Sequence, residues 1–289
     1  MKLQLDKWYL DLATDNHLAF HYVMRLRIGP ITIGASEFHH FHPEGSAESF
    51  RIARVRREDG GGLQVGRASL ILGADRLALV MRHGRCAIRG VWTPIGVHGN
   101  LSPAVVYRTR LGWCDWRIVS PRAAVDAKVW LPSGTVTLRG SGYVDAVRFA
   151  FPFREIPFYR LYWARLHSGS DWIVLFHAET RSGRLSLYTD GACVSRRASV
   201  RTNRGPGGRA KSFEWVVADR DCRRTVCVET VRILEQHSLL DRGLLGKLFP
   251  DSLLRAVSSS GVEAKYEAMA VINRQEYHGI AEEVVWHGV

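Results

Sequence analysis

The sequence predicts an all-β protein made of antiparallel strands. Apolar and polar residues alternate with period two along most of the chain, as in residues 171–179 and 76–81, and this pattern is typical of half-buried strands. Turn-forming pairs such as Asp59-Gly60 and Asp190-Gly191 recur at short intervals between the alternating segments. Short strands separated by such turns favour meanders that form a barrel or a sandwich over alternating strands and helices.

The length predicts two such β units. A chain of 289 residues is about twice as long as one eight-stranded ligand-binding barrel. We therefore expect an N-terminal barrel over residues 1–139 and a C-terminal barrel over residues 140–289. One segment, 238–258, departs from the alternation because its leucines recur at helical spacing and Pro250 divides it. We expect it to form a short helical insert that packs on a barrel end as a lid or plug.

The positive charge is interpreted as solvated surface. The formal net charge is +12, but most of it comes from arginines spread over strands and turns. One cluster, Arg201, Arg204 and Arg209, flanks a glycine-rich turn, which is typical of an exposed hairpin end. We therefore expect no nucleic-acid partner, and weak association with an anionic membrane surface stays open as the alternative.

The cysteines and the N-terminus indicate a soluble, cytoplasmic protein. The five cysteines form no C-x-x-C pair, so reduced and partly buried thiols are expected rather than a disulfide framework or a zinc site. The first residues lack the apolar region of a secretion signal, and the chain has no run of eighteen apolar residues.

The candidate chemistry lies near the midpoint of the chain. The run Gly140-Ser141-Gly142-Tyr143-Val144-Asp145 is followed by Tyr162-Trp163-Ala164-Arg165. On strands, Tyr143 and Asp145 share one face, and so do Trp163 and Arg165. A nearby arginine would keep Asp145 ionised, whereas an apolar wall would keep it protonated. The sequence leaves both states open, and it also allows Asp145 and Arg165 to be a buried structural pair.

These motifs resemble a known superfamily. The pattern Gly-x-Gly-Tyr-x-Asp followed by Trp-x-Arg is similar to the midpoint signature of carotenoid 1,2-hydratases and AttH-like double-lipocalin proteins, a superfamily that includes tocopherol cyclases and lipocalin-type Diels–Alderases. The opening Lys7-Trp8-Tyr9-Leu10-Asp11, the 184–191 hairpin, Tyr266 and the terminal 279–283 segment also match. The resemblance implies two packed calycin barrels, a hydrophobic pocket and cofactor-free addition, cyclisation or cycloaddition on isoprenoid or polyketide molecules.

The chain departs from the hydratase-like pattern beside Asp145. Val144, Ala146 and Val147 stand where that pattern has polar residues. Hydration needs an acid and a site for water, so these changes favour cyclisation or pericyclic chemistry in a drier pocket.

A second candidate lies in residues 31–42. On a strand, Glu37 and His39 share a face with apolar residues, so they either line a cavity or mark the strand leaving the barrel rim. The three histidines His39, His40 and His42 also suggest a metal, but neighbouring side chains point to opposite faces and no second ligand cluster is evident. We therefore expect no metal and, because no nucleotide-binding loop is present, no cofactor.

The leading hypothesis is a cofactor-independent cyclase, isomerase or hydratase acting on a hydrophobic small molecule in an aromatic pocket. Asp145 would be the proton donor or electrostatic stabiliser and Tyr143 a hydrogen-bond donor. The substrate-binding residues would be Trp8, Glu37, His39, Trp163 and Arg165. The alternative is a non-catalytic carrier of a lipid or pigment, since such barrels also hold ligands unchanged. The sequence does not predict the oligomeric state.

Overall fold

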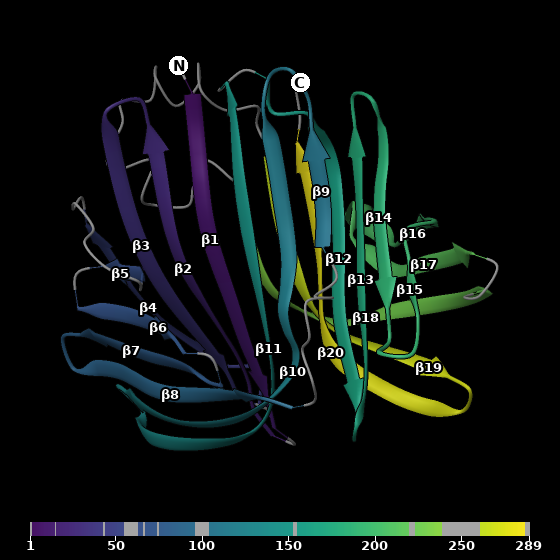
Figure 1. The fold of residues 1–289 in the computed structure, drawn as a ribbon. Coiled ribbons are helices and arrows are strands. Elements are labelled where there is room, and N and C mark those ends of the chain that lie inside the picture. Colours follow the sequence, from purple (N-terminus) through teal and green to yellow (C-terminus); the bar gives the residue numbers. More distant parts are fainter. Residues whose placement is uncertain are drawn as a thin grey trace. The chain divides into compact units, whose positions relative to one another are not determined.

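The computed structural model divides the chain into two compact units, Met1–Pro152 and Phe153–Val289 (Figure 1). It describes residues 2–14, 16–42, 44–54, 63–65, 67–73, 75–95, 104–152, 155–219, 223–238 and 261–286. Each unit contains one antiparallel sheet.

The expected all-β fold class is confirmed. Most described residues lie in strands, and the short 3₁₀ turn η2 (Pro206–Gly208) interrupts them. The described residues include no helix that is long and apolar enough to cross a bilayer. The helical insert expected at 238–258 lies outside the described residues, except that Ser238 ends a strand.

The N-terminal sheet has the strand order β4-β3-β2-β1-β11-β10-β8-β7-β6-β5, with β9 paired to β10. The strands β1, β2 and β3 lie side by side in Figure 1, and β5 returns beside β3 and β4, which makes the unit barrel-like. The bounds are β1 Lys2–Ala13, β2 Leu18–Ile28, β3 Ile31–Phe41, β4 Ala47–Arg54, β5 Leu63–Val65, β6 Ala68–Leu72, β7 Leu77–His83, β8 Cys86–Pro94, β9 Ala104–Arg108, β10 Trp113–Leu131 and β11 Gly134–Pro152.

Side chains on the concave face of this sheet form its hydrophobic core. Leu10, Val23, Phe38, Trp92 and Val144 are buried there together. Because successive side chains of a strand point to opposite faces, the residues beside them in sequence form a second face. That second face carries the polar candidates.

The C-terminal sheet has the strand order β15-β14-β13-β12-β20-β19-β18-β17-β16. Its core contains Tyr162, Phe213, Trp215 and Tyr266, and β16 lies beside β13 and β14. The bounds are β12 Phe158–Ser168, β13 Asp171–Thr180, β14 Gly183–Thr189, β15 Val194–Ser195, β16 Ala198–Arg204, β17 Ala210–Ala218, β18 Arg223–Ser238, β19 Gly261–Ile272 and β20 Gln275–Trp286.

The division between the units follows β11 rather than the glycines inside it. The boundary expected at 139/140 falls within that strand, which continues to Pro152. Gly140 and Gly142 instead permit close strand approach. A Cβ atom on Gly140 would lie 2.1 Å from the carbonyl oxygen of Ala13, and one on Gly142 would lie 2.4 Å from Val125 Cγ2. In the midpoint motif, the two glycines therefore allow close packing, and Tyr143 and Asp145 carry the functional groups.

The cysteines differ in part from the expectation. Cys86, Cys114 and Cys227 have free thiols, and burial raises the pKa of Cys114 to about 12. Cys193 is disulfide-bonded, so the expectation of five reduced thiols is wrong for that residue. Disulfides are rare in reducing compartments, and this bond removes one argument for a cytoplasmic location.

Candidate functional site

Two rows of side chains cross the second face of the N-terminal sheet. In the first row, Tyr9 of β1 pairs with Asp145 of β11 on one side and with Tyr22 of β2 on the other. Tyr22 in turn pairs with Glu37 of β3, which pairs with Arg51 of β4. The register therefore places the two candidates from separate parts of the sequence, Asp145 and Glu37, in one row. We call this row the acid row.

The second row lies next to the acid row on the same face. Tyr143 pairs with Asp11, Asp11 with Phe20, and Phe20 with His39. Two further candidates, Tyr143 and His39, thus also share the face. Asp145 and Glu37 are three strands apart, a separation of about 14 Å at the usual spacing of neighbouring strands.

Asp145 is buried and accepts two hydrogen bonds at one oxygen. Only 5% of the surface of Asp145 is exposed to solvent. The Tyr143 hydroxyl and the Trp116 indole Nε1 each donate to Asp145 Oδ2 over 3.0 Å. An indole N–H can only donate, so Oδ2 acts as an acceptor. The geometry thus favours the carboxylate as a charge stabiliser or base over a proton donor at this oxygen.

A β-bulge accompanies the Trp116 contact. The pairing of β10 with β11 shifts register between Ile118 and Ser120 and again between Ser120 and Ala123. Bulges redirect side chains and are frequent beside functional sites. Here the irregularity begins where Ile118 pairs with Asp145 itself.

Aromatic rings fill the space between the two acids. The ring centroids of Tyr9 and Tyr22 are 5.3 Å apart, and those of Tyr9 and Tyr143 are 6.2 Å apart. Phe20 continues this cluster and stacks on His39 with a centroid distance of 4.7 Å. Flat apolar surfaces with hydroxyl groups suit an unsaturated or polycyclic ligand.

Glu37 lies in a cationic setting. Arg51 Nη2 is 2.5 Å from Glu37 Oε1 and 2.6 Å from Oε2, and His39 Nε2 is 3.1 Å from Oε1. Burial opposes ionisation of Glu37, but the contacts with His39 and Arg51 outweigh it and lower the pKa to about 2. Glu37 is therefore ionised at neutral pH and is unsuited to act as an acid.

The other expected site residues lie elsewhere. Trp8 is on the opposite face of β1 from Tyr9 and packs against the hydrophobic core. Trp163 and Arg165 belong to the C-terminal unit, where they share the face of β12 that is opposite to its core residue Ala164. Both are buried, with Arg165 only 1% exposed. The structure thus joins Asp145 with Tyr143 and Glu37 with His39, and it places Trp8 apart from them.

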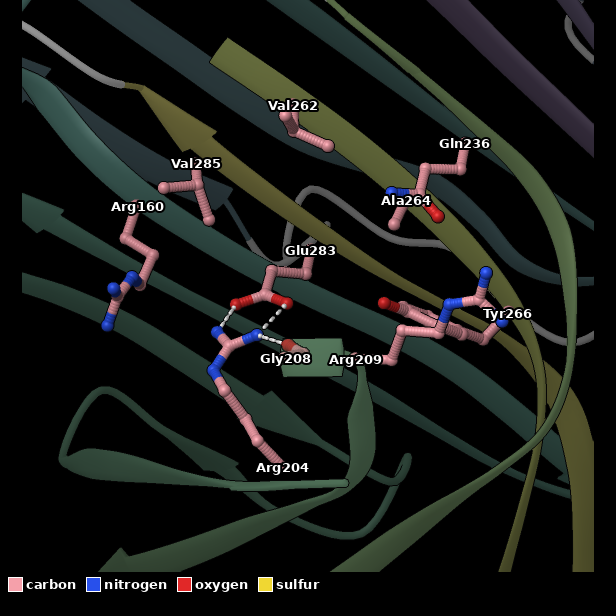
Figure 2. Close-up of a pocket in the computed structure, with 10 residues that line it drawn as sticks. All are labelled: Arg160, Arg204, Gly208, Arg209, Gln236, Val262, Ala264, Tyr266, Glu283 and Val285. Atoms are coloured by element: carbon pink, nitrogen blue, oxygen red, sulfur yellow. Dashed lines mark hydrogen bonds and ion pairs between the residues drawn. The ribbon is translucent and has the colours of Figure 1, made fainter. Parts of the chain in front are cut away.

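The C-terminal unit contains a pocket at one end of its core. The cavity has a volume of about 260 Å³. Figure 2 shows Arg204 pointing toward Glu283, with Arg160 and Arg209 on either side. Its lining residues are Arg160, Arg204, Gly208, Arg209, Gln236, Val262, Ala264, Tyr266, Glu283 and Val285.

An ion pair organises this pocket. Arg204 Nη1 donates to Glu283 Oε2 over 3.3 Å and to the carbonyl oxygen of Gly208 over 2.7 Å, and Arg204 Nη2 also contacts Glu283. Burial raises the pKa of Tyr266, and the charge of Glu283 adds to the effect. Arg204 thus combines a side chain that is 36% exposed with an ion pair to the buried carboxylate of Glu283.

Three histidines gather on the core face of the N-terminal barrel. One ring nitrogen from each of His17, His40 and His42 lies within 4.8 Å of the others. Burial lowers the pKa of His40 to about 4, with further contributions from the charges of His42 and His17. No second ligand cluster for the histidines of β3 is evident from the sequence, and the fold brings His17 to His40 and His42.

Sequence reasoning missed several residues of the acid row and its contacts. Tyr9 lies in the opening motif, so it could have been found, but Tyr22 and Arg51 stand in ordinary alternating segments. Trp116 gives no sequence signal because its contact with Asp145 depends on the bulge.

The fold is that of several solved structures. No protein-family model and no curated protein sequence matches the chain. An AttH-like protein from Nitrosomonas europaea superposes with a TM-score of 0.64 at 9% identity over 98% of this chain and 91% of that chain. CghA, crystallised with Sch210972, gives a TM-score of 0.65 at 11% identity over 99% of this chain and 89% of that chain.

A third structure, kievitone hydratase from Nectria haematococca, gives a TM-score of 0.59 at 10% identity over 98% of this chain and 88% of that chain. At 9–11% identity, the likeness to these structures concerns the fold alone. The expected fold is therefore confirmed.

Proposed function

We propose that the protein is an enzyme that catalyses a cofactor-independent cyclisation, isomerisation or hydration of a hydrophobic small molecule. The ligand would lie on the aromatic face that carries Tyr9, Tyr22 and Tyr143. Asp145 would stabilise positive charge, or accept a proton, as the reaction proceeds.

The observation that supports this proposal most is the arrangement of donors around Asp145. Trp116 and Tyr143 hold Oδ2 in a fixed position on a buried face. A carboxylate held by fixed hydrogen-bond donors needs little rearrangement when charge develops next to it. Such a group stabilises a cationic transition state more effectively than a solvated carboxylate does.

The surroundings of Asp145 favour cyclisation or isomerisation over hydration. Tyr9 and Ile118, which pair with Asp145 from the two neighbouring strands and so share its face, are buried. A carbocation that formed beside polar, hydrated groups would be captured by water, whereas an apolar aromatic face allows internal ring closure. Kievitone hydratase shares the fold, so hydration stays within the proposed reaction types.

Untargeted mass spectrometry tests the proposal without a known substrate. The purified protein is incubated with a small-molecule extract of the source cells, and the consumed and formed masses are compared. Cyclisation or isomerisation gives a product with the mass of its substrate, and hydration adds one water. Asp145→Asn should abolish the conversion. The control Asp126→Asn, whose side chain is 66% exposed, should retain it. Equal conversion by wild type and Asp145→Asn would contradict the proposal.

A second candidate function, ligand carriage, rests on the pocket of the C-terminal unit. The cavity of about 260 Å³ combines an apolar wall with arginines at Arg160, Arg204 and Arg209. This combination suits an amphipathic molecule with a carboxylate or other anionic group. If the protein only carries such a molecule, an unaltered ligand should co-purify with it, and Arg160→Gln should reduce the amount bound. An unchanged ligand content in Arg160→Gln would argue against binding at this pocket.

A further inference from the structure

We propose that His17, His40 and His42 form a zinc site at one end of the N-terminal barrel. The three residues lie on the core face, opposite to the acid row, so this inference is independent of the proposed reaction at Asp145.

Strand pairing brings the three residues together. His40 and His42 are two residues apart, so they project from the same side of the chain at the end of β3. The register pairs Ala19 with His40 and Leu18 with Phe41. Continuing that register by one residue places His17 opposite His42. Ala19 belongs to the hydrophobic core, which identifies the face as the inner one.

The backbone of His17 is fixed before any ion binds. The Thr14 backbone N–H donates to the His17 carbonyl oxygen over 2.9 Å, and the His17 N–H donates to Thr14 Oγ1 over 2.9 Å. A ligand held by its own turn loses little conformational freedom on binding a metal. His40 is held by the pairing of β3 with β2 and β4, and the His42 backbone N–H donates to the Ser46 carbonyl oxygen over 2.9 Å.

The nitrogen spacing matches a zinc coordination sphere. His40 Nε2 lies 3.2 Å from His17 Nδ1. Two ligands of a tetrahedral zinc ion with Zn–N bonds of about 2.0–2.1 Å are about 3.3 Å apart. One ring nitrogen of His42 lies within 4.8 Å of a ring nitrogen of each of the other two histidines, so a rotation of the His42 side chain would complete the set.

Of the three histidines, His40 is the one whose buried position is least accounted for by its hydrogen bonds. It is fully buried, and its Nδ1 has no hydrogen-bond partner among the described residues. Its Nε2 only faces another imidazole nitrogen. A metal at Nε2 would add a strong bond to this buried ring, whose one hydrogen bond among the described residues joins it to a second imidazole.

A carboxylate lies behind the cluster. Glu48 Oε2 is 3.2 Å from His42 Nε2, and the Ser133 backbone N–H and hydroxyl both donate to Glu48. Metal-bound histidines commonly have such a carboxylate on their other ring nitrogen, where it fixes the ring orientation. His42 would then coordinate the ion through Nδ1.

The donor set suits zinc and excludes calcium and magnesium. Three imidazoles suit zinc, copper, nickel and cobalt, whereas calcium and magnesium require oxygen ligands. Three protein ligands leave a fourth position for water or for an anionic group of a ligand. The ion would also fasten the β1–β2 turn to the end of β3.

Zinc titration of the full chain tests the site. The chain, with any affinity tag removed, is freed of metal with EDTA and then titrated with zinc chloride against a chromogenic chelator. We expect one zinc ion per chain. Substitution with cobalt should give the visible absorption of a tetrahedral nitrogen site. Glu48→Gln should weaken binding about 10–100-fold, and His42→Gln and His17→Gln should weaken it more.

Two matched variants serve as controls. His83→Gln removes an exposed imidazole from the same unit, and His39→Gln removes one from the opposite face of β3. Both should bind zinc as the wild type does. Circular dichroism confirms that each variant is folded, and His42, whose side chain is 23% exposed, is the ligand least needed for folding. Absence of stoichiometric zinc in the wild type, or unchanged affinity in folded His17→Gln and His42→Gln, would overturn the proposal.

Discussion

Acidification should weaken the N-terminal barrel through Glu37. The pKa of this residue is lowered to about 2 in the folded protein from an ordinary value of 4.5. A lowered pKa contributes stability that is fully present above the unfolded value and is lost as the pH falls through the folded value. The relevant window therefore extends from about pH 4.5 down to about pH 2.

The size of the effect follows from the two pKa values. The difference between the two pKa values stabilises the folded protein by about 3 kcal/mol at pH 7. About 1 kcal/mol of this stabilisation remains at pH 3. Glu37→Gln mimics the protonated side chain at every pH. The difference in unfolding free energy between wild type and Glu37→Gln should thus shrink from about 3 kcal/mol at pH 7 to about 1 kcal/mol at pH 3.

Urea denaturation at the two pH values measures this difference. Groups that do not interact with Glu37 titrate in the same way in both proteins and cancel in the subtraction. Asp126→Asn is the control because its partner Arg139 is 77% exposed and the pair is solvated, so its effect should be small at both pH values. If the Glu37→Gln difference were the same at pH 7 and pH 3, the carboxylate would not be held by Arg51 and His39 as described.

Three further predictions concern other parts of the chain. Burial lowers the pKa of His21 to about 3 from 6.5. Between pH 6.5 and 4.5, the unfolding free energy of the wild type, measured in urea, should therefore fall by about 1.4 kcal/mol per pH unit more than that of His21→Leu. Parallel pH profiles of the two proteins would contradict this. Gly142→Ala should lower the unfolding free energy by about 1–3 kcal/mol because its Cβ has no room, and an unchanged urea midpoint would refute the packing role. Arg204→Gln should cost about 3 kcal/mol by leaving Glu283 unpaired, and the added change Glu283→Gln should restore most of that loss; no restoration would show that the pair is not coupled.

Alternation and turn chemistry were sufficient to predict the strands. Residues 171–179 form most of β13, although burial there is continuous over residues 173–178 rather than alternating. The same rule placed Tyr143 with Asp145 and Trp163 with Arg165 on shared faces. The boundary at 139/140 could not be predicted correctly, because glycines that permit close packing resemble glycines that end a strand. Here they lie in the middle of β11.

The site depended on long-range pairing that no local pattern contains. Asp145 and Glu37 are joined through Tyr9 and Tyr22 only because β1 lies between β2 and β11. Trp116 lies opposite Val147 and so shares the face of Asp145, but this position depends on two register shifts between β10 and β11 that no local pattern predicts. His17 meets His40 for the same reason: the turn that connects β1 to β2 returns it to the end of β3.

Single-turnover measurement of Asp145→Asn tests the central claim most directly. Once the substrate is identified by mass spectrometry, the rate of the chemical step and the dissociation constant are measured for the wild type, Asp145→Asn and Tyr143→Phe. Asn keeps an oxygen that can accept from Trp116 and Tyr143, so the fold and the affinity should be nearly retained. The rate should fall about 10²–10⁴-fold for a positioned charge or base, with a smaller loss in Tyr143→Phe. A folded Asp145→Asn variant that turns over its substrate at the wild-type rate would contradict the account.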